Sequence, residues 1–198
     1  MHSHASSRFR ITHSMWHHDY DVRGSQVYHV DNSSWSPGKP DLTFHAGSNT
    51  SAPVAGICKF KHFSSDTEIG LRDSKQPDGM SWVRLNRQGF FKVQYNLRMD
   101  VGDHQPHIFT WKSTRSRGID TSDNLKLVDE QTRQVVAVFS SGSAFSSKPS
   151  QLDIHVNYGD RFQLLVLVTG LAVHENSRRA RAAAAGSAGA AAGAGGGC

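Results

Sequence analysis

Cysteine is scarce in this chain of 198 residues, which contains only Cys58 and Cys198. Two cysteines do not make a disulfide scaffold of the kind that stabilises small secreted domains. Cys58 lies in an apolar segment and is typical of a small buried residue, whereas Cys198 is the last residue. We expect no disulfide between them and prefer a reduced, cytoplasmic protein.

Long apolar runs are also missing. The longest extends from Phe162 to Val173, well short of the roughly 20 residues that span a bilayer as a helix. Residues 1–13 are rich in serine and histidine and lack the apolar core of a secretory signal. We therefore expect neither a membrane-spanning helix nor a signal peptide, and we assign residues 1–13 to a disordered N-terminal segment.

The charge shows little excess of one sign once the C-terminal end is set apart. The sequence contains 22 basic and 17 acidic residues, a net charge of +5. Arg178, Arg179 and Arg181 lie near the end, so 19 basic residues remain against the same 17 acidic ones. The signs are mixed along the chain, and aromatic residues do not alternate with basic ones. Nucleic acid is therefore not an expected partner.

Motifs of enzymes and metal sites are absent from the sequence. It has no P-loop, dinucleotide fingerprint or nucleophile elbow, and residues 140–143 and 100–103 are typical of turns. His104 and His107 have no cysteine or carboxylate partner at the spacing of a zinc site. We expect no enzymatic activity, no metal and no cofactor. A small-molecule carrier, or a hydrolase with a His/Asp pair in a barrel mouth, is the alternative.

What the sequence does contain is an alternation with a period of two. From Phe91 to Met99, apolar and polar residues alternate, as in a strand with one buried face. No long amphipathic helix separates the similar segments, which argues against a parallel sheet. Eleven segments are expected to form strands, at residues 20–22, 27–30, 41–45, 54–61, 68–72, 82–85, 91–99, 107–112, 125–129, 135–139 and 152–156.

One segment, at about residues 160–176, departs from this period. Asp160 and Gln163 resemble a capping box, and Arg178 and Arg179 suit the negative end of a helix dipole. A buried strand is the alternative, because three valines and a threonine favour β structure. The capping pattern, the length and the basic end favour the helix.

A helix that is apolar on every face must be enclosed by other parts of the protein. This requirement predicts a mainly β fold: an antiparallel, closed or nearly closed barrel of about 10–12 strands around a central hydrophobic C-terminal helix. Gly170 marks either the close approach of a strand or simple tolerance. The expected core residues of the helix are Phe162, Leu164, Leu165, Val166, Leu167, Val168, Leu171 and Val173.

The last zone, residues 180–198, contains ten alanines and six glycines among its nineteen residues. Each glycine disfavours a helix by about 1 kcal/mol relative to alanine, so we expect a disordered tail after a barrel domain at residues 14–179. Cys198 is open to S-acylation, but a single acyl chain is a weak anchor without a second signal. The three arginines are fewer than a polybasic patch contains.

Several segments resemble the tubby C-terminal-like superfamily, which includes tubby proteins, phospholipid scramblases and LURP-one-related proteins. Residues 20–31 are similar to its early hairpin, in which an aromatic-x-Val strand and a glycine precede Val-Tyr-x-Val-Asp. Residues 109–112, 124–129 and 135–139 resemble late strands of uncharacterised fungal members, and residues 162–179 resemble their closing helix. The resemblance implies a barrel wrapped on a central helix.

The resemblance also implies a binding or scaffold role. Tubby proteins bind phosphoinositides through basic surface residues, but no such motif transfers here residue by residue, and no calcium-binding segment of scramblases is evident. We therefore expect a monomeric, cytoplasmic binding domain whose ligand is a phosphoinositide or an anionic membrane surface. A protein-binding stress or defence regulator without a lipid ligand is the alternative. Strand parity turns the candidate headgroup-binding residues outward: Lys59, Lys61, Arg84, Lys92 and Arg98.

Overall fold

The computed structural model describes residues 7–14, 18–33, 38–61, 66–72, 79–89, 93–102, 105–114, 124–142 and 148–193. Lys92, His104 and Cys198 lie outside these ranges.

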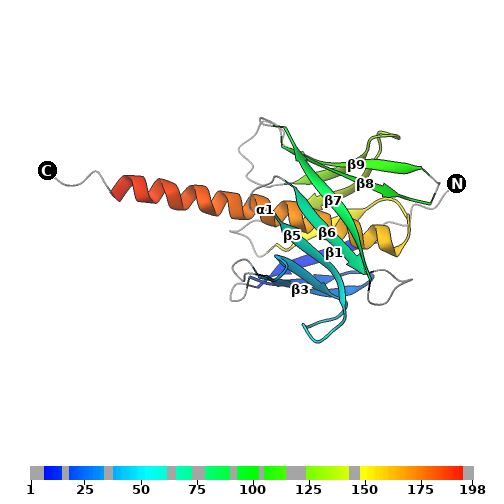
Figure 1. Ribbon diagram of the computed structural model, residues 1–198, viewed down its shortest axis with the longest axis horizontal. Helices are drawn as coiled ribbons and strands as arrows, with labels where there is room; N and C mark the ends of the chain where they lie inside the picture. The colour runs from blue at the N-terminus through cyan, green and yellow to red at the C-terminus, as the bar shows by residue number, and fades with distance from the viewer. Residues whose placement is uncertain are drawn as a thin grey trace.

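Twelve antiparallel strands form one closed barrel in which each strand pairs with its neighbours in the sequence, and β1 closes the ring against β12 (Figure 1). The predicted fold class is confirmed. The strands are β1 (Ser7–His13), β2 (Tyr20–Arg23), β3 (Val27–Asn32), β4 (Leu42–His45), β5 (Val54–Phe60), β6 (Thr67–Arg72), β7 (Met80–Gln88), β8 (Gln94–Asp100), β9 (Pro106–Ser113), β10 (Leu125–Asp129), β11 (Val135–Ser140) and β12 (Ser150–Ile154).

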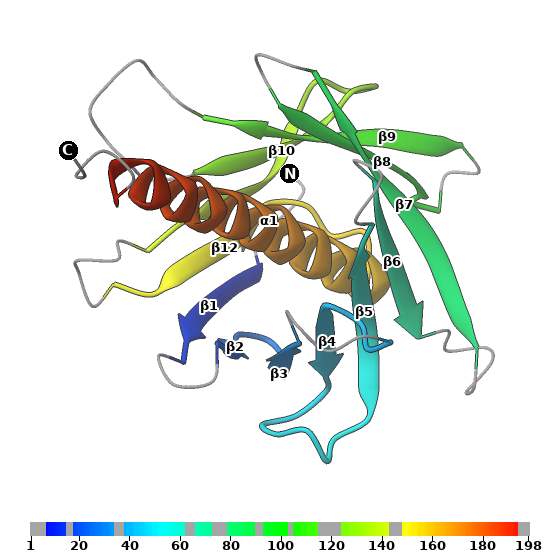
Figure 2. The same ribbon diagram turned by 60° about the vertical axis from the view of Figure 1, so that its left-hand side comes forward.

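One helix is present in the described ranges, α1 (Asp160–Gly193), and it runs through the ring of strands (Figure 2). Its segment at residues 165–168 is fully buried, because the inward residues of the strands surround it on all sides. The helix is therefore the correct interpretation of this segment, and the alternative of a strand is wrong. Of the eight expected core residues, seven are buried, whereas Leu164 is only partly buried against the core.

Thr169 and Gly170 of α1 both contact the same tryptophan of the barrel, Trp111. Trp111 on β9 donates its indole N–H to Thr169 Oγ1 at 3.0 Å, and Thr169 donates to the Leu165 carbonyl at 2.7 Å. A Cβ atom added at Gly170 would lie 3.1 Å from Trp111 Cζ2. Of the two interpretations of Gly170, close approach of a strand is therefore correct, since the Trp111 ring occupies that space.

Both ends of α1 differ from the predictions. The Gly159 carbonyl accepts the first helical bond, from the Gln163 amide at 3.1 Å, so Gly159 is the N-cap and Asp160 is an acid of the first turn. The helix also continues to Gly193, beyond the expected end near residue 176 and into the expected disordered tail (Figure 1). A helix already formed inside the barrel can extend through alanines without a new nucleation step.

The first strand was missed by the prediction that residues 1–13 are disordered. Ser7–His13 forms β1, which pairs with β2 and β12 and buries Phe9 and Ile11, each 2% exposed. The four other described residues between Arg8 and His13 are polar, so the segment has little apolar signal by itself.

No helix in the described part of the chain has the length and apolar character to cross a bilayer.

Candidate binding sites

Three of the candidate basic residues lie on one outer face of the barrel. Lys59 on β5, Arg84 on β7 and Arg98 on β8 are all exposed, and Arg98 stands directly opposite Ile108 of β9 in the sheet register. Arg84 and Arg98 line one hollow of about 400 Å³ together with Trp82 and Ile108. We call Lys59, Trp82, Arg84, Arg98 and Ile108 the outer-wall patch.

The apolar members of the outer-wall patch are unusually exposed for their size. Trp82 is 50% exposed and Ile108 43% exposed. Trp82 lies opposite Gly70, where an added Cβ atom would lie 3.3 Å from the indole ring. The absence of a side chain at Gly70 therefore leaves room for the ring to lie over the glycine backbone. The Lys59 ammonium stands 5.2 Å from the centre of the same ring, as in a cation–π contact.

The two remaining candidates have different positions. Lys61 Nζ binds Glu68 Oε1 at 2.7 Å, a contact that holds the pKa of the Glu68 carboxyl below its usual value. Lys92 lies outside the described residues. Trp82 and Ile108 were missed at the sequence level, although the parity that turns Leu85 inward also turns Trp82 and Arg84 outward together.

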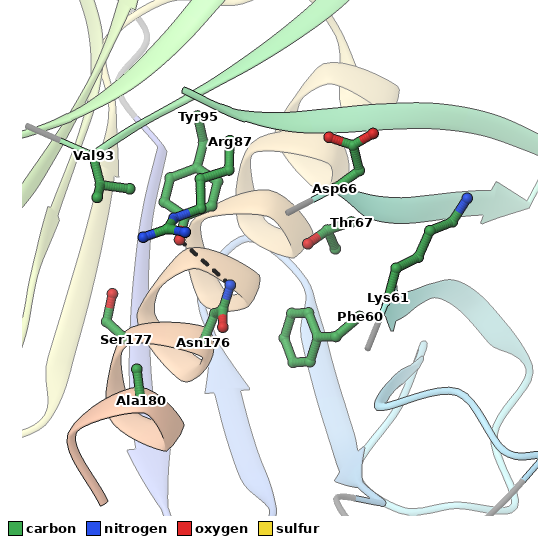
Figure 3. A pocket seen from close by; sticks show the side chains of 10 residues that line it. All are labelled: Phe60, Lys61, Asp66, Thr67, Arg87, Val93, Tyr95, Asn176, Ser177 and Ala180. Atoms are coloured by element: carbon green, nitrogen blue, oxygen red, sulfur yellow. Dashed lines mark hydrogen bonds between the residues drawn. The ribbon is translucent and has the colours of Figure 1, made fainter. Parts of the chain in front are cut away.

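A second site, the mouth pocket, lies where α1 leaves the barrel (Figure 3). It has a volume of about 320 Å³ and is bounded by α1 at residues 176–180 and by the ends of β5 to β8. Asn176 donates its amide N–H to the Tyr95 hydroxyl at 3.4 Å. Figure 3 shows the Arg87 guanidinium beside that hydroxyl and the Phe60 ring across the hollow. The sequence offered no signal for this site, because its residues come from five separate elements.

The exit of α1 is held by a buried carboxylate. Glu175, whose side chain is fully buried, accepts hydrogen bonds from Tyr20 at 2.5 Å, Asn32 at 3.1 Å, Arg178 at 2.7 Å and Arg179 at 2.8 Å. Burial alone raises the pKa of Glu175, but these donors outweigh it and lower the pKa to about 2. We call these five residues the helix clamp. Their hydrogen-bonding groups are paired with one another within the cluster, which indicates a structural role.

Arg179 makes further contacts between the helix clamp and the barrel. Its guanidinium also donates to Asp41 Oδ1 at 2.7 Å and to Asn32 Oδ1 at 2.8 Å, and it stands 4.8 Å from the centre of the Phe60 ring. Arg179, which was interpreted as a partner of the helix dipole, therefore joins α1 to β3, to the residue before β4 and to β5.

His174, next to the helix clamp, is the most perturbed histidine of the described chain. Burial lowers its pKa to about 4, with Arg178 and His13 acting in the same direction and Glu175 against them. Its ring packs 5.2 Å from that of Phe139, and its Nδ1 atom is buried without a hydrogen-bond partner. The site therefore favours the neutral imidazole.

This environment predicts acid sensitivity. The unfolded chain binds a proton at His174 near pH 6.5 and the folded chain only near pH 4, so stability rises with pH in this window. We expect the unfolding free energy to fall by about 3 kcal/mol as the pH is lowered across it. Urea unfolding at stepped pH measures this, and His174→Phe should flatten the profile. A His155→Gln control should keep the wild-type slope; a His174→Phe profile parallel to wild type would contradict the assignment.

Two histidine and carboxylate pairs lie within hydrogen-bond reach in the described barrel wall. His29 Nδ1 is 3.2 Å from Asp21 Oδ1, whose side chain is 53% exposed, and the second pair is buried. His107 Nδ1 and Asp129 Oδ2 are 2.8 Å apart, and Asp129 also accepts the backbone N–H groups of Gln131 and Thr132. These bonds hold the pKa of Asp129 below its usual value against the effect of burial. Asp129 therefore shapes the turn between β10 and β11 and positions His107, which is a structural arrangement.

Other reactive groups of the described chain are enclosed or dispersed. Cys58 is fully buried, and burial raises the pKa of its thiol well above the ordinary value, which disfavours the reactive thiolate. Among the residues that the structure describes, no three histidine, cysteine or acidic side chains gather in a way that could hold a metal ion.

Comparison with known proteins adds no assignment to this geometry. No protein-family model, no curated protein and no solved structure matches the chain.

Proposed function

We propose that this chain is a tubby-like, non-enzymatic binding domain that docks on an anionic phospholipid surface through the outer-wall patch. The observation that carries the proposal is the exposed Trp82 ring, which has the Lys59 ammonium 5.2 Å from its centre and Arg84 two residues along the same strand. Aromatic rings favour the membrane interface, and basic side chains near them are attracted to anionic headgroups. The closed barrel with a central helix agrees with the architecture that the tubby-like resemblance implies.

The charge balance of the outer-wall patch supports the same proposal. Glu68 faces the patch from β6, where Lys61 binds it and where Arg84 and Lys59 also lower the pKa of its carboxyl. One carboxylate is thus set against four basic side chains, those of Lys59, Lys61, Arg84 and Arg98, and the patch keeps a net positive charge. The two guanidinium groups that line the hollow bind phosphate oxygens through paired N–H donors. The exposed apolar surface of Trp82 and Ile108 would be covered when the face rests on lipid.

Vesicle flotation tests the proposal. Full-length protein is expected to float with phosphatidylcholine vesicles that contain phosphatidylserine and to stay behind with phosphatidylcholine alone. Each basic residue near such a surface contributes about 1 kcal/mol. The double variant Arg84→Gln/Arg98→Gln should therefore bind roughly 30-fold more weakly, and Trp82→Ala should also weaken flotation.

The matched control changes the same charge elsewhere. Arg10 on β1 and Arg23 on β2 are exposed and face each other in the sheet register, far around the barrel from β7. Arg10→Gln/Arg23→Gln should float like wild type. Vesicles of equal surface charge that contain a phosphoinositide show whether headgroup structure matters beyond charge. Equal flotation of both double variants, or no flotation of any protein, would overturn the proposal and favour a protein-binding role.

A further inference from the structure

The mouth pocket shares no residue with the outer-wall patch and is formed by elements that the fold already fixes. Its floor combines Tyr95, which is 7% exposed, with the Asn176 amide of α1. Because α1 is enclosed by the barrel below this point and held by the helix clamp, the pocket exists before any ligand arrives. Preformed hollows with a few converging polar groups are the usual form of small-molecule sites.

The charges around the mouth pocket select an anion of low charge. Arg87 is the guanidinium that lies beside the Tyr95 hydroxyl, whereas Lys61 points away and binds Glu68 (Figure 3). Asp66 at the rim is a carboxylate, which disfavours a second negative charge on the ligand. A monoanion fits this balance better than a phosphate dianion.

The neutral donors favour a flat anion with two oxygens. Burial raises the pKa of the Tyr95 phenol above its usual value, so the phenol keeps its proton. The hydroxyl groups of Thr67 and Ser177 border the same hollow. A guanidinium fork binds the two oxygens of a carboxylate side by side, and hydroxyl groups next to it complete the shell of donors.

The apolar wall of the mouth pocket defines the rest of the ligand. One side is the Phe60 ring, which Arg179 approaches to 4.8 Å, and another is Val93. Aromatic rings favour offset or edge contacts with other rings. A volume of about 320 Å³ is at the lower end of the range for ligand pockets, which suits one or two rings.

We propose that the mouth pocket binds a small aromatic monocarboxylate, with its carboxylate on Arg87 and its ring on Phe60. The proposal does not depend on membrane docking, because the outer-wall patch lies on a different surface.

Amide chemical-shift titration of the full chain by NMR tests this proposal, with 2-naphthoate as the probe. We expect saturable shifts at Asn176 and Ser177. Replacement of the carboxylate by the neutral amide (2-naphthamide) and loss of the ring (butyrate) should each raise the dissociation constant at least tenfold. Inorganic phosphate should bind more weakly than 2-naphthoate.

Two variants separate charge from shape. Arg87→Gln should raise the dissociation constant for 2-naphthoate at least tenfold, and Ala180→Phe, at an exposed position of α1, should close the hollow while Arg87 stays. The control Arg23→Gln, at an exposed position of β2 outside both sites, should bind 2-naphthoate like wild type. Unchanged binding by Arg87→Gln, equal binding of the amide, tighter binding of phosphate, or the absence of shifts at Asn176 and Ser177 would each overturn the proposal.

Discussion

Replacing Leu165 or Leu167 by aspartate is expected to abolish soluble folding. Both side chains are fully buried in the middle of α1, at the centre of the barrel. The substitution removes apolar contacts worth about 2–5 kcal/mol and adds a carboxylate for which the apolar core offers no partner, at a further cost of several kcal/mol. The sum is comparable with the whole stability of a domain of this size, about 5–15 kcal/mol.

Soluble yield and thermal melting followed by circular dichroism measure this effect. Arg181→Asp is the matched control, because it places the same side chain on an exposed position of the same helix. Its effect should stay within about 0.5 kcal/mol. A soluble Leu165→Asp variant that melts cooperatively would show that α1 is peripheral to folding.

Replacing Glu175 by alanine is expected to lower the unfolding free energy by about 3–5 kcal/mol. Removal of one partner from a buried ionic network leaves the others without compensation. In the helix clamp, the Tyr20 hydroxyl and the guanidinium groups of Arg178 and Arg179 lose their shared acceptor. Urea unfolding at neutral pH measures the difference.

The surface residue Glu130 is the control for this variant. It binds Lys112 at 2.6 Å and Arg133 at 3.0 Å near the turn between β10 and β11 and remains 25% exposed, whereas Glu175 is fully buried. Glu130→Ala should therefore cost about 1 kcal/mol, as expected for solvent-accessible ion pairs. The pH dependence provides a second readout. Because the folded pKa of Glu175, about 2, is below its ordinary 4.5, its contribution is complete above pH 4.5 and is lost as the pH falls toward 2. Glu175→Ala should therefore lose less stability than wild type between pH 4.5 and pH 2, and an equal loss in both proteins over this range would contradict the assignment.

The strands were predictable where one buried face produces an alternation of apolar and polar residues in the sequence. All eleven expected strands are present, since alternation over a few residues is a local property of a sheet with one face on the core. β1 was missed because only Phe9 and Ile11 carry its pattern and its partners are 145 residues away in one direction, as in the ion pair of Arg8 and Asp153. β1 is held in place by its pairing with β12, which exists only once the barrel has closed.

The candidate sites were predictable only in part, for the same reason. Parity within a strand turned Lys59, Arg84 and Arg98 outward, but it could not tell that Arg84 and Arg98 line one hollow together with Ile108 of β9. Lys61 has the same parity as Lys59, yet a cross-strand carboxylate binds it. The mouth pocket had no local signal, because Tyr95 and Asn176 are 81 residues apart.

The sequence by itself determined the β class, the enclosed helix and hence the barrel. Burial of one face gives a strand an apolar–polar alternation with a period of two, and burial on all sides gives a helix apolar residues on every face. Both patterns can be recognised within a short segment. The tertiary structure decided which charges meet: Glu175 with four donors from three elements, Trp82 over Gly70, and Arg87 across from Phe60. Such encounters depend on the stagger of strands around the ring and on where α1 emerges from it. These quantities depend on the closed barrel as a whole, so no short segment of the sequence records them.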